Sequence, residues 1–291
     1  MCPLCGQRPR TVIRSRREIE AELARRARLS RAALRDVTEA TLGAPADILR
    51  CERCGVLIRD AAPGDDVFRE DRYSARVLRT LHAVHAEAFR RKARRYRWLL
   101  PRRARVVEIG SYAGGFLRAA AEWGWRAAGI DIGGDTSRFT RALGFEMRDE
   151  IGACDAVFVW NCFEQVSAPR ELLRGVASAL TDGGVLVVRV PDAAFYMTAH
   201  DPSLLGWPHR YGYDLRALAR LGAEYRFALR RTLRCPVIWP LPDPLAPRGW
   251  IELTFRKTAA ARSRSACFEH GERRAREIRS ARRRPESAAR E

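Results

Sequence analysis

Four of the eight cysteines stand in two copies of one short motif. The copies are Cys2-Pro3-Leu4-Cys5-Gly6 and Cys51-Glu52-Arg53-Cys54-Gly55. Two thiolates at this spacing can hold one metal ion from a tight turn, and the glycine tolerates the backbone conformation that such a turn requires. Four sulfur ligands make a closed tetrahedral site of the kind that Zn²⁺ occupies in structural roles. We therefore predict a structural zinc site at Cys2, Cys5, Cys51 and Cys54, in preference to redox-active or incidental thiols.

A second motif is a glycine-rich turn that reads Glu108-Ile109-Gly110-Ser111-Tyr112-Ala113-Gly114-Gly115. Glycines in such a turn let a cofactor approach the backbone closely. Asp131 follows about 20 residues later, where a carboxylate can accept hydrogen bonds from both hydroxyls of a ribose. A dinucleotide would place its pyrophosphate at the turn, but Glu108 carries the wrong charge for a phosphate. The motif therefore favours a cofactor that has an ammonium group.

Alternating strands and helices position these motifs. Strands are predicted over 105–109, 127–132, 145–148, 155–160, 185–190, 225–233 and 250–255. Helices are predicted over 114–123, 169–180 and 214–221, and a further helix follows the second strand and ends at 143. Such βα units with apolar strands predict a Rossmann-like, doubly wound α/β fold. Ligands in this fold bind beyond the carboxyl ends of the strands, at the point where the strand order reverses.

A basic helix is predicted ahead of these units, over 74–100, and Pro101 should end it. Val77, Leu81, Val84 and Ala88 form its expected apolar stripe, and His82 and His85 are expected at the surface. We predict four parts of the chain. They are a zinc-binding module with a helical insert (1–73), a basic linker helix (74–103), a catalytic domain (104–257) and a basic, flexible tail (258–291).

The net charge of +19 is unevenly distributed. Residues 76–104 carry ten Lys or Arg and one Asp or Glu, whereas residues 105–255 carry 17 of each. The neutral body argues against a nucleic-acid-binding groove across the catalytic domain, although basic flanks can hold polyanions. The sequence shows no apolar run of about 18 residues and no signal peptide, which predicts a soluble, cytoplasmic protein.

Several motifs in order resemble those of the class I S-adenosylmethionine-dependent methyltransferases. They are Glu108 to Leu117, Gly129 to Ile132, Cys154 to Val157 with Phe163 to Val166, and Leu180 to Leu186, and the resemblance covers roughly residues 105–230. It implies a cofactor site that holds S-adenosylmethionine. The implied residues are Glu108, Gly110, Ser111, Tyr112, Gly114, Asp131, Ile132, Asp149 and Trp160, with Asp131 on the ribose and Asp149 or Glu150 near the adenine.

A zinc segment before the catalytic domain resembles that of the sugar C-methyltransferases, which act on nucleotide-linked deoxysugars. The resemblance implies a small molecule, a nucleotide sugar or a glycan as the methyl acceptor. Gln165 stands where this family often has a histidine, so we predict His209 as the base and Tyr211 as an orienting residue. Two alternatives stay open. One is an RNA methyltransferase, and the other is a non-catalytic zinc-containing scaffold with a degenerate methyltransferase domain.

Overall fold

The computed structural model describes residues 2, 4–9, 11–27, 46–60, 73–93, 95–198, 209–235 and 249–259. Met1–Thr258 form one compact unit, and Ala259–Glu291 form a second. Within the predicted insert, helix α1 spans Arg16–Ala27. The rest of that insert and almost all of the predicted flexible tail lie outside the described residues. Among the described residues, no helix is both long enough and apolar enough to cross a membrane.

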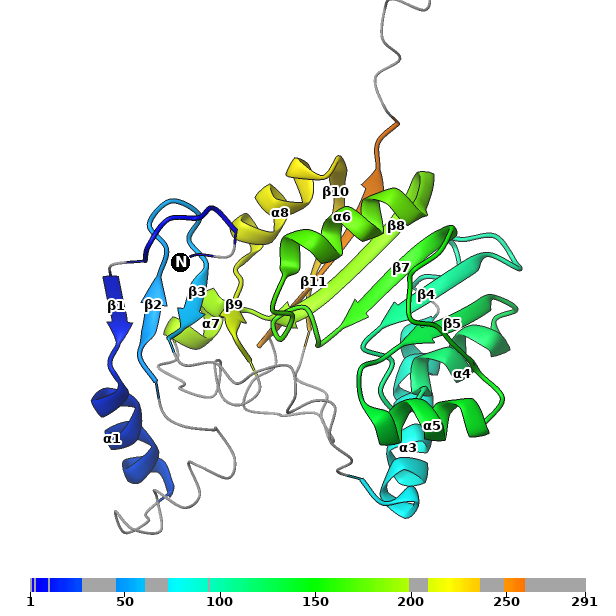
Figure 1. The fold of residues 1–291 in the computed structure, drawn as a ribbon, viewed down its shortest axis with the longest axis horizontal. Helices are drawn as coiled ribbons and strands as arrows, with labels where there is room; N and C mark the ends of the chain where they lie inside the picture. Colours follow the sequence, from blue (N-terminus) through cyan, green and yellow to red (C-terminus); the bar gives the residue numbers. More distant parts are fainter. Residues whose placement is uncertain are drawn as a thin grey trace, which may run out of the picture. The chain divides into compact units, whose positions relative to one another are not determined.

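A seven-stranded sheet forms the centre of the unit (Figure 1). Its strands, in spatial order, are β10 (Phe227–Cys235), β11 (Trp250–Lys257), β8 (Leu180–Pro191), β7 (Cys154–Trp160), β4 (Arg105–Ile109), β5 (Arg126–Ile130) and β6 (Glu146–Met147). The strands from β8 to β6 are parallel, and β11 runs against both of its neighbours. This mostly parallel sheet confirms the predicted α/β fold.

Helices cover both faces of the large sheet (Figure 1). Helices α6 (Pro169–Ala179) and α8 (Leu215–Glu224) pack on one face, and α3 (Ala75–Ala93), α4 (Gly115–Glu122) and α5 (Gly134–Ala142) lie on the other. Because side chains alternate along a strand, β7 sends Val157 and Val159 to the first face and Phe158 and Trp160 to the second. Both faces of β7 are therefore buried, which explains why the interior of this strand carries only apolar side chains.

Helix α3 packs with a different face from the one predicted. Val77 and Val84 of the expected apolar stripe are 43% and 40% exposed, whereas Leu78, Ala86 and half-buried Phe89 face the protein. The reason is a close approach between α3 and α4. A Cβ atom on Gly115 would lie only 2.3 Å from the Cβ of His85, so this glycine permits the contact that sets the rotation of α3.

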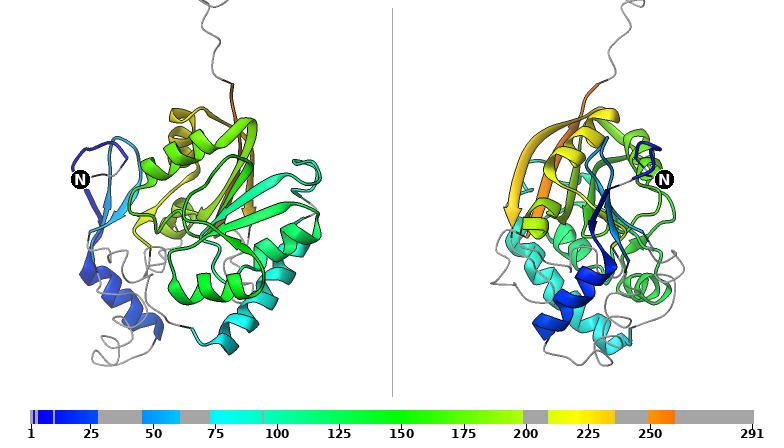
Figure 2. Two further views of the ribbon diagram at one scale, coloured as in Figure 1. Left: turned by 45° about the vertical axis from the view of Figure 1, so that its right-hand side comes forward. Right: turned by 90° about the vertical axis from the view of Figure 1, so that its left-hand side faces the viewer.

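A second, four-stranded antiparallel sheet has the order β1-β2-β3-β9. Its strands are β1 (Thr11–Arg14), β2 (Ile48–Arg50), β3 (Leu57–Arg59) and β9 (Tyr211–Gly212). The first three come from the N-terminal segment, and β9 follows the short helix α7 (Ala193–Thr198) much later in the chain. Figure 2 shows the blue N-terminal strands beside the main body from two further sides. This sheet joins the cysteine motifs to the segment that contains His209.

Candidate cofactor and metal sites

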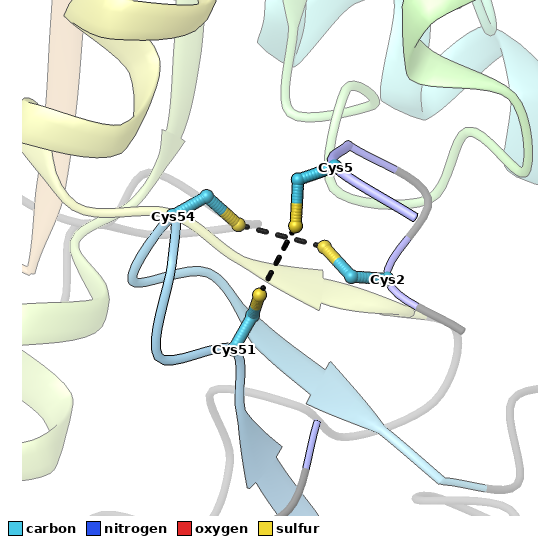
Figure 3. A group of neighbouring side chains, drawn as sticks. All are labelled: Cys2, Cys5, Cys51 and Cys54. Atoms are coloured by element: carbon cyan, nitrogen blue, oxygen red, sulfur yellow. Dashed lines mark hydrogen bonds between the residues drawn. The ribbon is translucent and has the colours of Figure 1, made fainter. Parts of the chain in front are cut away.

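The four predicted cysteine ligands converge (Figure 3). Their sulfur atoms all lie within 4.8 Å of one another, with 3.5 Å between Cys2 and Cys54 and 3.3 Å between Cys5 and Cys51. Zinc–thiolate bonds of about 2.3 Å in a tetrahedron would place the sulfurs about 3.8 Å apart. All four thiols are free, and they therefore fit one tetrahedral Zn²⁺ ion.

Both cysteine turns have the same hydrogen-bond pattern. The amide of the first cysteine donates to the carbonyl five residues later, from Cys2 to Gln7 (2.7 Å) and from Cys51 to Val56 (3.0 Å). The glycine amides donate back to the carbonyls of those cysteines, at 2.9 and 2.7 Å. Gly6 and Gly55 have φ angles of +72° and +75°, a region that side chains disfavour. The predicted need for glycine is therefore visible in the backbone.

The thiols of this cluster differ in acidity. Burial raises the pKa of Cys2, and burial with the neighbouring thiols raises that of Cys54. At Cys51 burial also acts to raise the pKa, but hydrogen bonds from the Cys54 amide and the Cys5 thiol outweigh it and bring the pKa to about 7. Cys51 is thus the thiol most ready to release its proton when a metal ion binds.

Glu108 lies inside the protein at the end of β4. Its carboxyl group is buried, and its Oε2 atom has no hydrogen-bond partner among the described residues. Burial raises the pKa of Glu108 well above its usual range, and the negative charge of Asp131 raises it further. A buried carboxyl group without a partner is costly, so its surroundings are suited to a cationic ligand group.

Asp131 follows β5, as predicted, and its carboxylate already binds the glycine-rich turn. It accepts hydrogen bonds from the amide of Tyr112 (2.7 Å), the amide of Gly133 (2.8 Å) and the hydroxyl of Thr136 (2.9 Å). Burial raises the pKa of Asp131 despite these bonds. A carboxylate has about four acceptor positions, so Asp131 can serve the loop and still accept from a ligand hydroxyl.

The glycine-rich turn keeps a glycine-like conformation at Tyr112. This residue has a φ angle of +48°, and its ring lies against Tyr73 and His85, with centroids 5.3 and 5.9 Å away. The turn therefore accommodates a tyrosine at this position by directing its side chain toward His85 of α3. The neighbouring Ser111 hydroxyl donates a hydrogen bond to the sulfur of Met147 (3.7 Å).

Two glycines of the turn are sterically required. A Cβ atom on Gly110 would lie 2.7 Å from the side chain of Cys162, and one on Gly114 would lie 2.9 Å from Thr140. Both also have positive φ angles, +72° and +71°. Cys162 follows β7, so the loop after that strand packs directly on the turn.

The other predicted cofactor residues occupy different environments. Ile132 is 50% exposed beside Asp131, and Asp149 is exposed after β6. Trp160 is buried among aromatic rings, stacked on Phe158 at 5.5 Å. Its indole nitrogen has no hydrogen-bond partner among the described residues. Ile132 and Asp149 are thus open to a ligand, while the Trp160 ring belongs mainly to the core.

His209 lies beside a buried glutamate that the sequence reasoning did not single out. The Nε2 atom of His209 is 3.4 Å from Oε1 of Glu164. Glu164 is fully buried, and burial raises its pKa to about 8. Its carbonyl accepts the amides of Arg210 and Tyr211, at 2.9 and 3.0 Å, which holds the histidine segment against the loop after β7. Glu164 lies in the Phe163 to Val166 segment that resembles a methyltransferase motif, and this was the available signal.

Tyr211, in β9, and Tyr213, just after it, lie in different environments. The Tyr211 hydroxyl donates to the carbonyl of Ser167 at 3.3 Å, and Tyr213 is completely buried against Phe163. Tyr211 is therefore the more accessible of the two.

Both histidines of α3 face the protein, so the surface position predicted for them is wrong. The Nδ1 atom of His82 lies 2.7 Å from the carbonyl oxygen of Ala113. Burial, followed by the charges of Lys92 and His82, lowers the pKa of His85 to about 4. These residues support the glycine-rich turn from outside. The two histidines stand three residues apart on the helix face of Leu78 and Phe89. Had this face been chosen as the buried one, the sequence would have predicted that both histidines face the protein.

Comparisons with known proteins give one family match. A family model described as a methyltransferase domain matches residues 79–235, from α3 to the end of β10. No curated protein matches the sequence. Similar solved structures include an S-adenosylmethionine-dependent methyltransferase from Mesorhizobium loti, with 18% identity, a TM-score of 0.46, and coverage of 56% of this chain and 96% of that one.

Two further solved structures are similar in the same way. One is an S-adenosylmethionine-dependent methyltransferase from Thermotoga maritima, with 17% identity, a TM-score of 0.47, and coverage of 62% of this chain and 94% of that one. The other is magnesium protoporphyrin IX methyltransferase from Synechocystis with bound S-adenosylhomocysteine, with 12% identity, a TM-score of 0.47, and coverage of 66% and 92%.

Proposed function

Because the chain belongs to the methyltransferase family whose model spans residues 79–235, and is an S-adenosylmethionine-dependent enzyme, we propose that it methylates a small molecule, a nucleotide sugar or a glycan. The observation that carries this proposal is the pairing of His209 with buried Glu164 at 3.4 Å. It provides a proton acceptor next to the loop that packs on the glycine-rich turn. Residue roles below are part of the proposal.

Glu108, Gly110 and Asp131 would hold the cofactor. The carboxyl oxygen of Glu108 that has no hydrogen-bond partner suits the cofactor's ammonium group. The positive charge of that group would favour the ionised form of Glu108. The remaining acceptor position of Asp131 suits a ribose hydroxyl, and exposed Ile132 offers an apolar surface to the adenine. The bound cofactor supplies an electrophilic methyl group on a sulfonium, and the protein aligns the acceptor with it.

His209 would take the proton that the acceptor releases. Its side chain is 18% exposed, and the Glu164 side chain beside it is 1% exposed, so a partner from solvent reaches the imidazole more readily than the carboxyl group. Glu164 would orient the imidazole through its buried carboxyl group. Tyr211 is placed to orient the acceptor.

Zinc at the four cysteines is the second part of the proposal. The convergence of four free thiols from two matching turns supports it. Elemental analysis of the purified protein should find about one zinc per chain, and Cys54→Ser should lose it. A metal-free wild type would refute the assignment.

Methyl transfer from tritiated cofactor to nucleotide sugars, glycans and RNA tests the acceptor class. We expect label in a nucleotide sugar, a glycan or another small acceptor, and a strong loss of transfer in His209→Gln at unchanged cofactor affinity. Asn or Gln variants of exposed Asp60 serve as folding-neutral controls. Label appearing in RNA alone would replace the proposed acceptor class with the RNA alternative.

A further inference from the structure

A pocket of about 330 Å³ lies between the second cysteine turn and α8. It is lined by Arg50, Arg53, Cys54, Gly55, Asp214, Arg216, Ala217 and Arg220. In Figure 3 the yellow ribbon of α8 stands next to the turn that carries Cys54. The two walls are separated by about 160 residues of chain, so the fold itself brings their arginines together. No predicted cofactor or catalytic residue lines this pocket.

The charge of the pocket wall is strongly positive. It contains four arginines and a single acid, Asp214, and the Asp214 carboxylate caps α8 by accepting the amide of Ala217 at 2.7 Å. Arg220 is anchored through a hydrogen bond from Nη1 to the carbonyl of Arg53 (2.8 Å). Arg220 also pairs with Glu224 at 3.9 Å, whereas Arg50, Arg53 and Arg216 form no ion pair within the described part of the chain.

Other surface arginines of the protein have close acidic partners. Arg90 pairs with Glu122 at 2.6 Å, and Arg105 pairs with Asp155 at 3.0 Å. A zinc ion held by four thiolates would place two negative charges beside the pocket. The wall carries an excess of three positive charges over Asp214, and Glu224, which lies outside the wall, offsets one of them by pairing with Arg220. The remaining excess balances the charge of a loaded metal site, and the guanidinium groups of Arg50, Arg53 and Arg216 stay available to an anionic ligand.

We propose that this pocket binds the phosphate or diphosphate group of a small molecule. Guanidinium groups match phosphate oxygens with paired hydrogen bonds, and a group with two or more charges satisfies several arginines at once. The N-terminal end of α8 adds a favourable dipole. The pocket is compact rather than a long basic stripe, which favours a small ligand over a nucleic-acid backbone. The binding does not depend on the identity of the methyl acceptor.

Calorimetric titration of pyrophosphate into the full-length protein at low ionic strength tests this proposal. We expect saturable binding that weakens with added salt. The double variant Arg50→Gln with Arg216→Gln should weaken the affinity by about tenfold or more. Arg126→Gln removes an equally exposed arginine on β5 and should leave the affinity unchanged. The cofactor affinity of the double variant, measured in parallel, reports on its fold.

Three results would overturn the proposal. They are the absence of pyrophosphate binding to the wild type, equal binding by the wild type and the double variant, and equal weakening by Arg126→Gln. Parallel titrations with inorganic phosphate and with a nucleoside diphosphate distinguish a pocket for a single phosphate group from a pocket for a diphosphate group. Binding of a single-stranded RNA oligonucleotide that the double variant loses, without binding of pyrophosphate, would also reject a small ligand. None of these outcomes affects methyl transfer, so this proposal can fail while the proposed function stands.

Discussion

At the scale of single residues, the buried acids dominate the chemistry of the site. Glu108 and Glu164 are both buried, and burial raises the pKa of each. Glu108 was predictable from its motif and Asp131 from its spacing. The pairing of Glu164 with His209 was not, because no periodicity relates residues 45 positions apart on different loops. Side-chain partners of this kind depend on the folded chain.

Glu108→Gln should separate charge from shape at the cofactor site. The amide keeps the volume but cannot become negative, so we expect the affinity for S-adenosylmethionine to fall by about ten- to a hundredfold. Stability should not decrease, because the variant removes a buried acid that lacks a partner. Calorimetry and urea unfolding measure the two effects. An unchanged affinity would remove Glu108 from the cofactor site.

Glu164→Gln should change how stability depends on pH. The pKa of Glu164 is about 8 in the folded protein against an ordinary 4.5, so between these values the folded state holds a proton that the unfolded state has released. Stability therefore falls as pH rises through this window, by at most about 1.4 kcal/mol per pH unit from this group. The variant should show a shallower slope in urea unfolding from pH 5 to 8. Glu171→Gln, on the exposed side of α6, should keep the wild-type slope.

At the scale of elements, the strands and helices of the large sheet followed from the sequence, and the short strands of the four-stranded sheet did not. The apolar run of β7 and the proline at the start of α6 identified those elements within a residue. Strands β2, β3 and β9 have only two or three residues, which is too short for an alternating pattern. The rotation of α3 was mispredicted because the contact at Gly115 outweighs the valine stripe.

Gly115→Ala tests the contact between α3 and α4. The new methyl group would lie 2.3 Å from the Cβ of His85 and 2.9 Å from the amide nitrogen of Ala86, so we expect a loss of about 1–3 kcal/mol in unfolding free energy. Gly175→Ala makes the same change inside α6, where the nearest atom is 3.6 Å away, and should stabilise by about 0.5–1 kcal/mol. Equal effects in both variants would argue against tight α3–α4 packing.

At the scale of the whole molecule, the cysteine turns and the segment that contains His209 meet in one sheet. The second turn connects β2 to β3, and β3 pairs with β9 through Leu57 with Gly212 and Ile58 with Tyr211. The amide of Arg59 also donates to the carbonyl of Arg210 at 3.0 Å. Metal binding at the turns should therefore stabilise the segment that carries His209.

Removal of the metal by a chelator should loosen this connection before it affects the large sheet. We expect faster hydrogen exchange in peptides that cover 56–60 and 209–213, while β7 and β8 stay protected, and re-added zinc should restore protection. Cofactor affinity should change little. Unchanged exchange in 209–213, or equal loss across the large sheet, would contradict a local role for the metal.

The bridge between Asp192 and Tyr213 closes the excursion that α7 and β9 make from the large sheet. These residues pair directly, and the amide of Ala193 donates to the carbonyl of Tyr213 at 3.0 Å. The chain thus leaves the large sheet at Asp192, just before α7, and returns to the same place at Tyr213, just after β9. Both ends of this excursion are held at one place, so α7 and β9 sit at the rim of the large sheet without adding a strand to it.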